Sequence, residues 1–291
     1  MNTPLQKLGL TAAQFGLDQG APARGRSPQA EAREILAIAH RARLGVLDVG
    51  HVFAQSETAL GEALPRPQPF RLCVTAGRCD RGPEHIEAEA RASLRRLGVE
   101  KAYAIVVDAP SDLFGLQGAA AWLRLQTLRD QGLFERIGIS AHVSDDPVGL
   151  AKRFHPDLIQ APASLLDQRL LADGSLAAIA KMGVEVHLRS IFLNGLLFLP
   201  PDRAHGPMEG AVSKLSRVRR MIAEGRSDPL QAALSFALSR AEASSVLVGV
   251  TTAAELSAVV AAAASPPADL DWDEMALDDA SVLDQRRWAA A

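Results

Sequence analysis

Short apolar runs alternate with longer amphipathic stretches along the whole chain. Most of the runs are almost continuously apolar, which is typical of strands that are buried on both faces of a parallel sheet. They predict eight strands, at Leu8–Ala13, Val46–Val49, Arg71–Ala76, Tyr103–Ala109, Arg136–Ala141, Leu158–Ala163, Val184–Ile191 and Ser245–Val250.

The stretches between the runs have apolar residues at helical spacing. They predict helices at Pro28–Ala42, Ser56–Leu64, Pro83–Leu97, Gly118–Gln131, Pro147–Arg153, Ser175–Met182, Ala211–Glu224, Pro229–Arg240 and Thr252–Ala263. Thr252 with Glu255 three residues later matches a capping box at the start of the last helix. Left-handed caps are expected where glycines end helices, at Gly45, Gly98, Gly132 and Gly183.

Eight successive strand-then-helix units predict an α/β fold, a single-domain (β/α)8 TIM barrel. An open doubly wound sheet is the alternative, but eight units exceed its usual number of strands, and no G-x-G-x-x-G motif follows a strand. We expect residues 1–264 to form the barrel and residues 265–291 to form a C-terminal tail packed on its outside.

The composition limits the kinds of partner that this protein is expected to bind. The 291 residues carry a formal net charge of −3 without a long block of one sign, and aromatic residues make up 4%, so neither a nucleic-acid nor a membrane-surface partner is indicated. Cys73 and Cys79 match no common zinc spacing, so no metal site is predicted. No apolar segment approaches the roughly 20 residues of a membrane span, and we expect a cytoplasmic protein. The oligomeric state is not indicated.

In such barrels the functional residues follow the strands, at the carboxyl ends. The polar and glycine residues in those places, with two phenylalanines, are Gln14, Phe15, Asp48, His51, Phe53, Thr75, Arg78, Asp108, Ser140, His142, Gln160, Arg189, Ser190, Asn194 and the segment from Gly249 to Thr252.

Several segments, in this order along the chain, carry a family pattern. They are Leu47-Asp48-Val49-Gly50-His51-Val52-Phe53-Ala54-Gln55-Ser56-Glu57 with Leu60-Gly61, then Ile137-Gly138-Ile139-Ser140, Gln160-Ala161-Pro162-Ala163-Ser164-Leu165-Leu166-Asp167, Arg189-Ser190-Ile191-Phe192-Leu193-Asn194-Gly195-Leu196-Leu197 and Val246-Leu247-Val248-Gly249-Val250. Together they resemble the aldo-keto reductase family over nearly the whole chain.

The resemblance implies hydride transfer from a nicotinamide cofactor to a carbonyl carbon. In the family a tyrosine donates the proton, a lysine held by an aspartate lowers the pKa of that tyrosine, and a histidine orients the carbonyl. Here Asp48 fills the aspartate position. Phe53 stands at the tyrosine position, Ala76 at the lysine position and Asp108 at the histidine position. Three of the four catalytic groups are therefore replaced, which indicates a degenerate active site.

Other groups are candidates for the missing acid. The chain's one tyrosine, Tyr103, precedes Asp108 by five residues, so it lies about 16 Å from the functional end of its strand. His51 is the better candidate, because an imidazole titrates near neutral pH. Arg78 is placed to pair with Asp48 or Asp108. The catalytic candidates are therefore Asp48, His51 and Asp108.

The resemblance also assigns cofactor-binding positions. Ser140 and Gln160 stand where the family holds the nicotinamide carboxamide. The loop after the seventh strand contributes Ser190, Phe192, Leu193 and Asn194. The start of the last helix contributes Gly249, Thr251, Thr252 and Glu255. Thr251 replaces the basic residue that family members often direct at the 2′-phosphate, so the expected cofactor is NADP or NAD.

Three functions remain open at this point. The first is an NAD(P)H-dependent reductase of an aldehyde or keto sugar, with altered or weak activity. The second is a catalytically silent member that binds a cofactor, a sugar-like ligand or a partner protein. The third is an enzyme of another type that uses Asp48 and Asp108 as a carboxylate pair.

Overall fold

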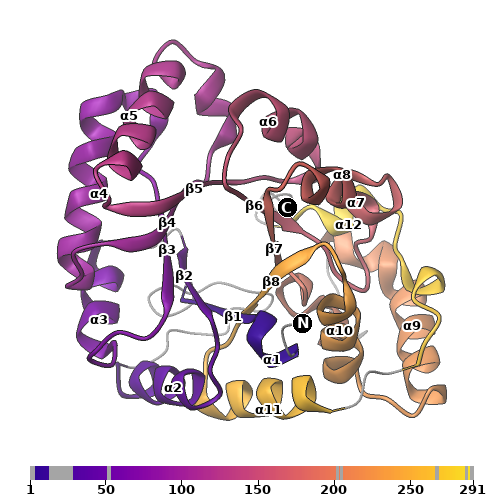
Figure 1. The fold of residues 1–291 in the computed structure, drawn as a ribbon. Coiled ribbons are helices and arrows are strands. Elements are labelled where there is room, and N and C mark those ends of the chain that lie inside the picture. Colours follow the sequence, from indigo (N-terminus) through magenta and orange to yellow (C-terminus); the bar gives the residue numbers. More distant parts are fainter. Residues whose placement is uncertain are drawn as a thin grey trace.

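Eight parallel strands close into a barrel in the computed structural model, which describes residues 4–12, 29–50, 54–200, 203, 206–265, 269–285 and 288 (Figure 1). Each strand pairs with its neighbours in the sequence, and β1 pairs with both β2 and β8 to complete the circle. The predicted TIM barrel is confirmed. The strands are β1 (Leu8–Thr11), β2 (Val46–Gly50), β3 (Arg71–Thr75), β4 (Ala102–Val107), β5 (Phe134–Ser140), β6 (Leu158–Pro162), β7 (Glu185–Arg189) and β8 (Ala243–Gly249).

Helices surround the barrel as an outer layer (Figure 1). They are α1 (Pro4–Lys7), α2 (Gln29–Arg41), α3 (Ala54–Ala63), α4 (Pro83–Leu97), α5 (Gly118–Asp130), α6 (Pro147–Phe154), α7 (Arg169–Ala172), α8 (Ser175–Lys181), α9 (Val212–Glu224), α10 (Pro229–Ser239), α11 (Ala253–Ala264) and α12 (Ala280–Leu283). Short 3₁₀ segments are η1 (Cys79–Arg81), η2 (Pro110–Phe114), η3 (Val143–Asp145), η4 (Leu193–Phe198), η6 (Gly206–Ala211) and η7 (Asp273–Met275).

Most predicted helix ends agree with the structure, and two details differ. Gly98, Gly132 and Gly183 have positive φ angles, as left-handed caps require. The prediction for Gly45 is wrong, because Arg43, with φ of 58°, takes the left-handed position after α2. Thr252 caps α11 by accepting from the Glu255 N–H, but the Glu255 carboxylate accepts from Thr251, so only half of the predicted capping box forms.

The apolar core has two main layers. Residues of one face of each strand pack against the surrounding helices, and a smaller cluster fills the inside of the barrel with Val46, Cys73, Ala104, Val106, Leu158 and Leu247. After α11, Met275, Leu277, Val282 and Leu283 pack in one cluster with residues of α9 and α10. The boundary between barrel and tail at residues 264 and 265 stays a prediction.

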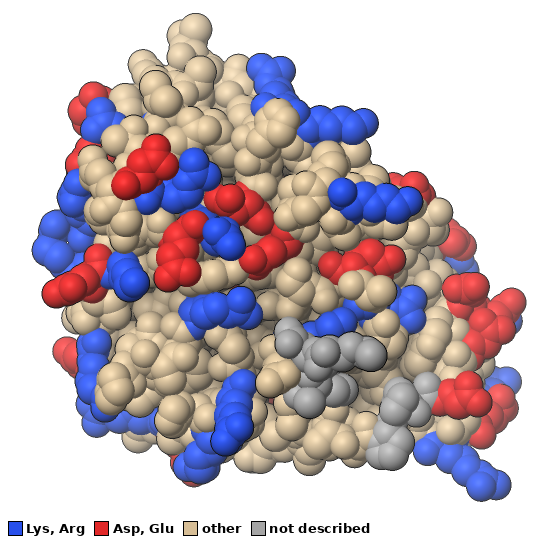
Figure 2. All heavy atoms as spheres, viewed as in Figure 1, with Lys and Arg blue, Asp and Glu red and all other residues tan. Residues whose placement is uncertain are grey.

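The surface has a mixed charge on the face seen in Figure 2, where basic and acidic side chains lie next to one another without an extended area of one sign. Among the described residues, no helix is long and apolar enough to cross a membrane.

Candidate active site

Asp48, near the end of β2, is buried with 9% of its surface exposed. Its carboxylate accepts hydrogen bonds from Thr11 Oγ1 at 3.2 Å and from Gln160 Nε2 at 3.0 Å. Burial raises the pKa of Asp48 above its ordinary value, and the two hydrogen bonds act against that rise. Asp48 is therefore anchored by neutral donors on two other strands.

The position at which the family pattern has a lysine is apolar in this chain. Ala76 directly follows β3, is buried, and donates its backbone N–H to the Val106 carbonyl at 2.8 Å. Asp108 follows β4 and is exposed, and its negative charge adds to the rise in the pKa of Asp48. The structure thus brings two carboxylates to one end of the barrel, and position 76 supplies no cation between them.

Arg78 lies close to these carboxylates in the sequence but forms its ion pairs elsewhere. Its guanidinium binds Asp112 through Nε at 2.7 Å and Nη2 at 2.9 Å, and Asp80 through Nη2 at 3.0 Å. The predicted pairing with Asp48 or Asp108 is therefore replaced by pairing with residues of η1 and η2.

The structure describes only some of the candidate proton donors. His51 and Phe53 lie outside the described residues, as do Gln14 and Phe15, so the role of His51 stays a prediction. Tyr103 is the second residue of β4, at the opposite end of the barrel from Asp108. Its hydroxyl donates to Glu185 at 2.7 Å, and burial together with this bond raises its pKa to about 12. Tyr103 is thus a structural residue and a very weak acid.

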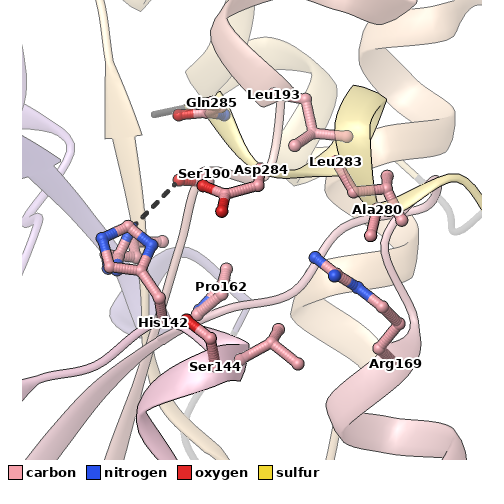
Figure 3. A pocket seen from close by; sticks show the side chains of 12 residues that line it. His142, Ser144, Pro162, Arg169, Ser190, Leu193, Ala280, Leu283, Asp284 and Gln285 are labelled. Atoms are coloured by element: carbon pink, nitrogen blue, oxygen red, sulfur yellow. Dashed lines mark hydrogen bonds between the residues drawn. The ribbon is translucent and has the colours of Figure 1, made fainter. Parts of the chain in front are cut away.

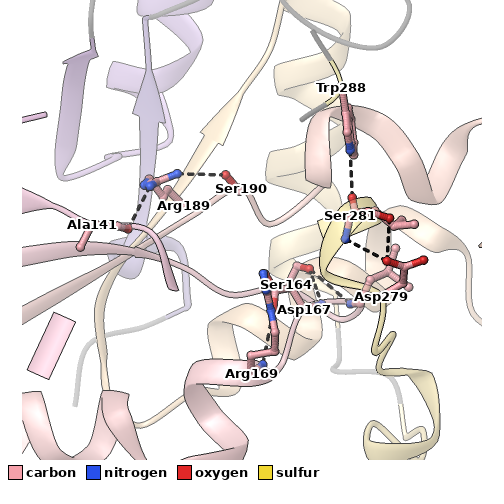
Figure 4. Close-up of polar contacts among 11 residues, drawn as sticks. Ala141, Ser164, Asp167, Arg169, Arg189, Ser190, Asp279, Ser281 and Trp288 are labelled. Carbon is pink, nitrogen blue, oxygen red and sulfur yellow. Dashed lines mark hydrogen bonds and ion pairs between the residues drawn. The ribbon is translucent and has the colours of Figure 1, made fainter. Parts of the chain in front are cut away.

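Ser140, the last residue of β5, lies beside Gln160, the middle residue of β6. They are register partners, and each has 5% of its surface exposed. Because Asp48 accepts from Nε2 of Gln160, the amide orientation is fixed with Oε1 as the remaining acceptor. A neighbouring guanidinium, that of Arg189, donates to the Ala141 carbonyl at 2.9 Å and to Ser190 Oγ at 3.4 Å (Figure 4).

The loop after β7 has an unusual backbone. Ser190, Leu193 and Asn194 have φ angles of 58°, 44° and 50°, and Gly195 follows at 89°. Non-glycine residues in this region are strained and concentrate at functional sites. Arg219 of α9 holds the loop from outside, because its guanidinium donates to the carbonyls of Leu196, Leu197 and Leu199. Sequence reasoning missed this role of Arg219.

A cavity of about 160 Å³ opens beside this loop (Figure 3). Its polar lining comes from His142 and Ser144 after β5, Arg189 at the end of β7 and Ser190 after it, Arg169 of α7, and Asp284 and Gln285 after α12. Arg169 is held by a bidentate ion pair with the buried Asp167, with both contacts at 2.8 Å (Figure 4).

One side of the same cavity is formed by residues near the C-terminus, which the sequence did not predict. Ala280, Leu283, Asp284 and Gln285 line it, and the Leu277 N–H of the preceding stretch donates to the Leu166 carbonyl at 2.8 Å. No sequence signal pointed to this wall, because the segment has no motif and its position depends on tertiary packing.

Carboxylates occupy the start of α11. Glu255 Oε2 accepts from the Thr251 N–H at 2.8 Å and from Thr251 Oγ1 at 3.1 Å. Glu31 of α2 accepts from the Ala253 N–H. No Lys, Arg or His occurs in residues 249–264. This helix start therefore already has negative partners, and it offers less to a further anion than an open helix N-terminus.

Comparison with known proteins places this geometry in a family. The model of the aldo/keto reductase family matches residues 7–277. No curated protein matches the chain as a relative. Among solved structures, the holo form of an aldo-keto reductase from Bacillus halodurans is 22% identical, with a TM-score of 0.75, over 92% of this chain and 89% of that one. Its apo form is 21% identical, with a TM-score of 0.69 and the same coverage.

A Pseudomonas aeruginosa protein, provisionally assigned to the aldo-keto reductases, is 18% identical over 89% of each chain, with a TM-score of 0.66. At these identities the structural likeness establishes the shared fold. The family model spans almost all of the sequence. The chain belongs to the aldo/keto reductase family.

Proposed function

We propose that this chain is an NAD(P)H-dependent oxidoreductase that reduces the carbonyl group of an aldehyde or keto sugar, and that its proton donor is not a tyrosine. The proposal rests on a pair of buried polar side chains, one at the end of β5 and one in the middle of β6. Ser140 and Gln160 are register partners, and Asp48 holds the Gln160 amide in one orientation. Family members generally use NAD(P)H.

The residues at this end of the barrel fit a nicotinamide ring. A buried hydroxyl and an oriented amide carbonyl are suitable partners for a carboxamide, which has two N–H donors and one acceptor. The strained loop from Ser190 to Gly195 is where a phosphate-bearing ligand would reach the barrel end. When bound, the cofactor supplies the hydride. The protein's part is to orient the ring, to exclude water and to provide a proton.

The other end of the proposed site favours NAD over NADP. Glu255 and Glu31 accept from backbone N–H groups at the start of α11, and Thr251 stands where the family has a basic residue. A carboxylate accepts a hydrogen bond from a ribose 2′-hydroxyl but repels a 2′-phosphate. We therefore expect NADH to bind more tightly than NADPH.

The proton must come from a group that is chemically able to donate it. His51 is the candidate from the sequence, and His142 is the imidazole that lines the described cavity. Asp48 is a third candidate, because burial raises its pKa and keeps part of it protonated at a higher pH than an exposed carboxyl. His51→Ala, His142→Ala and Asp48→Asn separate the three.

Fluorescence titration with NADH and with NADPH tests the proposal, followed by turnover on a panel of aldehydes and keto sugars. We expect saturable binding that Gln160→Leu weakens. Gln131→Leu, a change at the exposed residue that follows α5, should leave the binding unchanged. If the wild-type protein binds neither cofactor, the oxidoreductase proposal is wrong.

A second candidate function is a catalytically silent member that binds a cofactor, a sugar-like ligand or a partner protein. It is favoured by Ala76 and Asp108, which remove the family's cation and imidazole from the site. Binding without turnover would support it. Phe53→Tyr combined with Ala76→Lys should then restore reductase activity if the rest of the scaffold is intact.

A further inference from the structure

The cavity beside the β7 loop begins close to the pair proposed to hold the nicotinamide. His142 stands two residues after Ser140, Pro162 stands two residues after Gln160, and both His142 and Pro162 line the cavity (Figure 3). Two residues of extended chain span about 7 Å, so a molecule in the cavity lies near a ring held by that pair. One water needs about 10–15 Å³, and a cavity of about 160 Å³ therefore accommodates about ten non-hydrogen atoms.

Arg169 of α7 presents one edge of its guanidinium to this cavity. Asp167, with 2% of its side chain exposed, accepts from Nε and Nη2 at 2.8 Å each, and this ion pair fixes the orientation of the guanidinium. Among the described residues Nη1 has no hydrogen-bond partner, and Figure 3 shows the guanidinium pointing from α7 towards the other lining residues. The edge formed by Nη1 and Nη2 thus offers two parallel N–H donors, which is the arrangement that a carboxylate accepts.

The charges around the cavity match a ligand with a single negative charge. The described lining contains two guanidinium groups, Arg169 and Arg189, and one carboxylate, Asp284. One positive charge is therefore in excess, although Asp167 behind Arg169 takes up part of it. A doubly charged phosphate would remain partly unpaired here, whereas the charge of a carboxylate would be matched.

The remaining polar lining suits hydroxyl groups. Ser144, Ser190 and Gln285 each have a donor and an acceptor, and the Asp284 carboxylate accepts from hydroxyls. Leucines of the lining add apolar surface, against which the C–H groups of a sugar chain pack. A purely hydrocarbon ligand would remove water from the Arg169 guanidinium without replacing its hydrogen bonds.

We infer that this cavity binds a sugar acid, with the carboxylate of the substrate on Arg169 and its hydroxyl groups on Asp284 and the serines. The carbonyl group to be reduced then lies at the other end of the chain, near Ser140 and Gln160. An open-chain uronic acid, with an aldehyde at one end and a carboxylate at the other, has this arrangement. The assignment of the carbonyl end rests on the proposed function, whereas the binding of the carboxylate does not. The carboxylate takes no part in hydride transfer.

Binding is tested by isothermal titration calorimetry with gluconate and sorbitol, which share a polyhydroxy chain and differ in the carboxylate. Neither has an aldehyde or ketone, so both can be titrated into the protein alone and into the protein saturated with NADH. We expect gluconate to bind at least about tenfold more tightly than sorbitol in one or both states. Arg169→Gln should remove this preference, and the same change at the exposed Arg220 should leave it. Equal affinities, or a preference that survives Arg169→Gln, would overturn the inference.

Two further measurements cover a variant that does not fold and a different anion. Arg169→Lys retains a positive charge beside the buried Asp167, but its ammonium lacks the two parallel donors. It should weaken gluconate binding and leave sorbitol binding unchanged; an unchanged gluconate affinity would show that Arg169 does not hold the carboxylate. Inorganic pyrophosphate represents the phosphates of the cofactor. If it competes with gluconate and binds more tightly, the cavity belongs to the cofactor and the inference is wrong.

Turnover with NADH distinguishes this inference from the proposed function. Glucuronate should be reduced with a higher kcat/KM than glucose. Arg169→Gln should lower kcat/KM for glucuronate mainly through KM, because the carboxylate is held equally in the ground state and in the transition state. A preference for gluconate without NADH binding refutes the proposed function alone. NADH-dependent reduction of glucose and glucuronate with equal kcat/KM refutes this inference alone.

Discussion

Glu185→Gln should destabilise the protein at neutral pH and weaken the dependence of its stability on acid. Glu185 accepts from the Tyr103 hydroxyl at 2.7 Å with both oxygens, and it lies near His187 and Arg136. These groups favour the charged carboxylate. Glutamine keeps the shape and an acceptor for Tyr103, but it removes the charge.

The magnitude follows from the pKa of Glu185. Its fall from 4.5 to about 2, at about 1.4 kcal/mol per pH unit, corresponds to about 3 kcal/mol. Only 28% of the side chain is exposed, so solvent screening removes little of this. Because the folded-state pKa is depressed, the stabilisation is complete above pH 4.5 and is lost as the pH falls through about 2. At pH 3 about 1 kcal/mol of it should remain.

Urea unfolding followed by tryptophan fluorescence, at pH 7 and at pH 3, measures the effect. We expect Glu185→Gln to lower the free energy of unfolding by about 3 kcal/mol at pH 7 and by about 1 kcal/mol at pH 3. Glu135→Gln, a change at an exposed residue of strand β5, is the control. A difference between wild type and Glu185→Gln that is the same at both pH values would refute the reasoning, because the loss would then not be electrostatic.

Three further predictions concern the cofactor site and the packing of the helices. Thr251→Lys should raise the affinity for NADPH relative to NADH by at least about tenfold in fluorescence titrations, since a charge-assisted hydrogen bond contributes about 1.5–3 kcal/mol; an unchanged ratio would mean that the 2′-phosphate does not reach α11. Gly61→Ala should lower the free energy of unfolding by about 1–3 kcal/mol, because the new Cβ would stand 2.3 Å from the Arg96 carbonyl oxygen of α4. Gly210→Ala has no atom within 4 Å and should be nearly neutral, so equal losses would contradict the clash. Arg219→Met should speed amide hydrogen exchange in residues 193–199, whereas the same change at the exposed Arg220 should not.

The periodicity of the chain predicted the elements well because a closed barrel buries both faces of its strands. The apolar run at Leu158–Ala163 and the strand at Leu158–Pro162 are nearly the same, and the helix at Pro83–Leu97 agrees at both ends. The failure at Gly45 has a local cause. Arg43 reaches the left-handed conformation two residues earlier, and sequence patterns do not fix which of several residues ends a helix.

The sequence predicted which residues belong to the candidate site better than it predicted which side chains contact one another there. Family motifs pointed to Asp48, Ser140 and Gln160, and parallel strands bring their carboxyl ends to one side of the barrel. The partner of Arg78 was not predictable, because Asp112 comes from a loop after another strand. The alternation of Glu185, His187 and Arg189 was visible in the sequence, but it is hidden within a run that reads as mostly apolar.

The sequence by itself predicted the barrel and the family, because these depend on the periodicity and on which residue types stand at which strand ends. That Ala76 and Asp108 replace the family's cation and imidazole stays a prediction. The tertiary structure alone decided which charges meet. It paired Tyr103 with Glu185, brought the carboxylate of Glu31 to the start of α11, and brought the segment from Ala280 to Gln285 to the cavity. These contacts join residues far apart in the chain, and their strength depends on burial, which exists only once the barrel has closed.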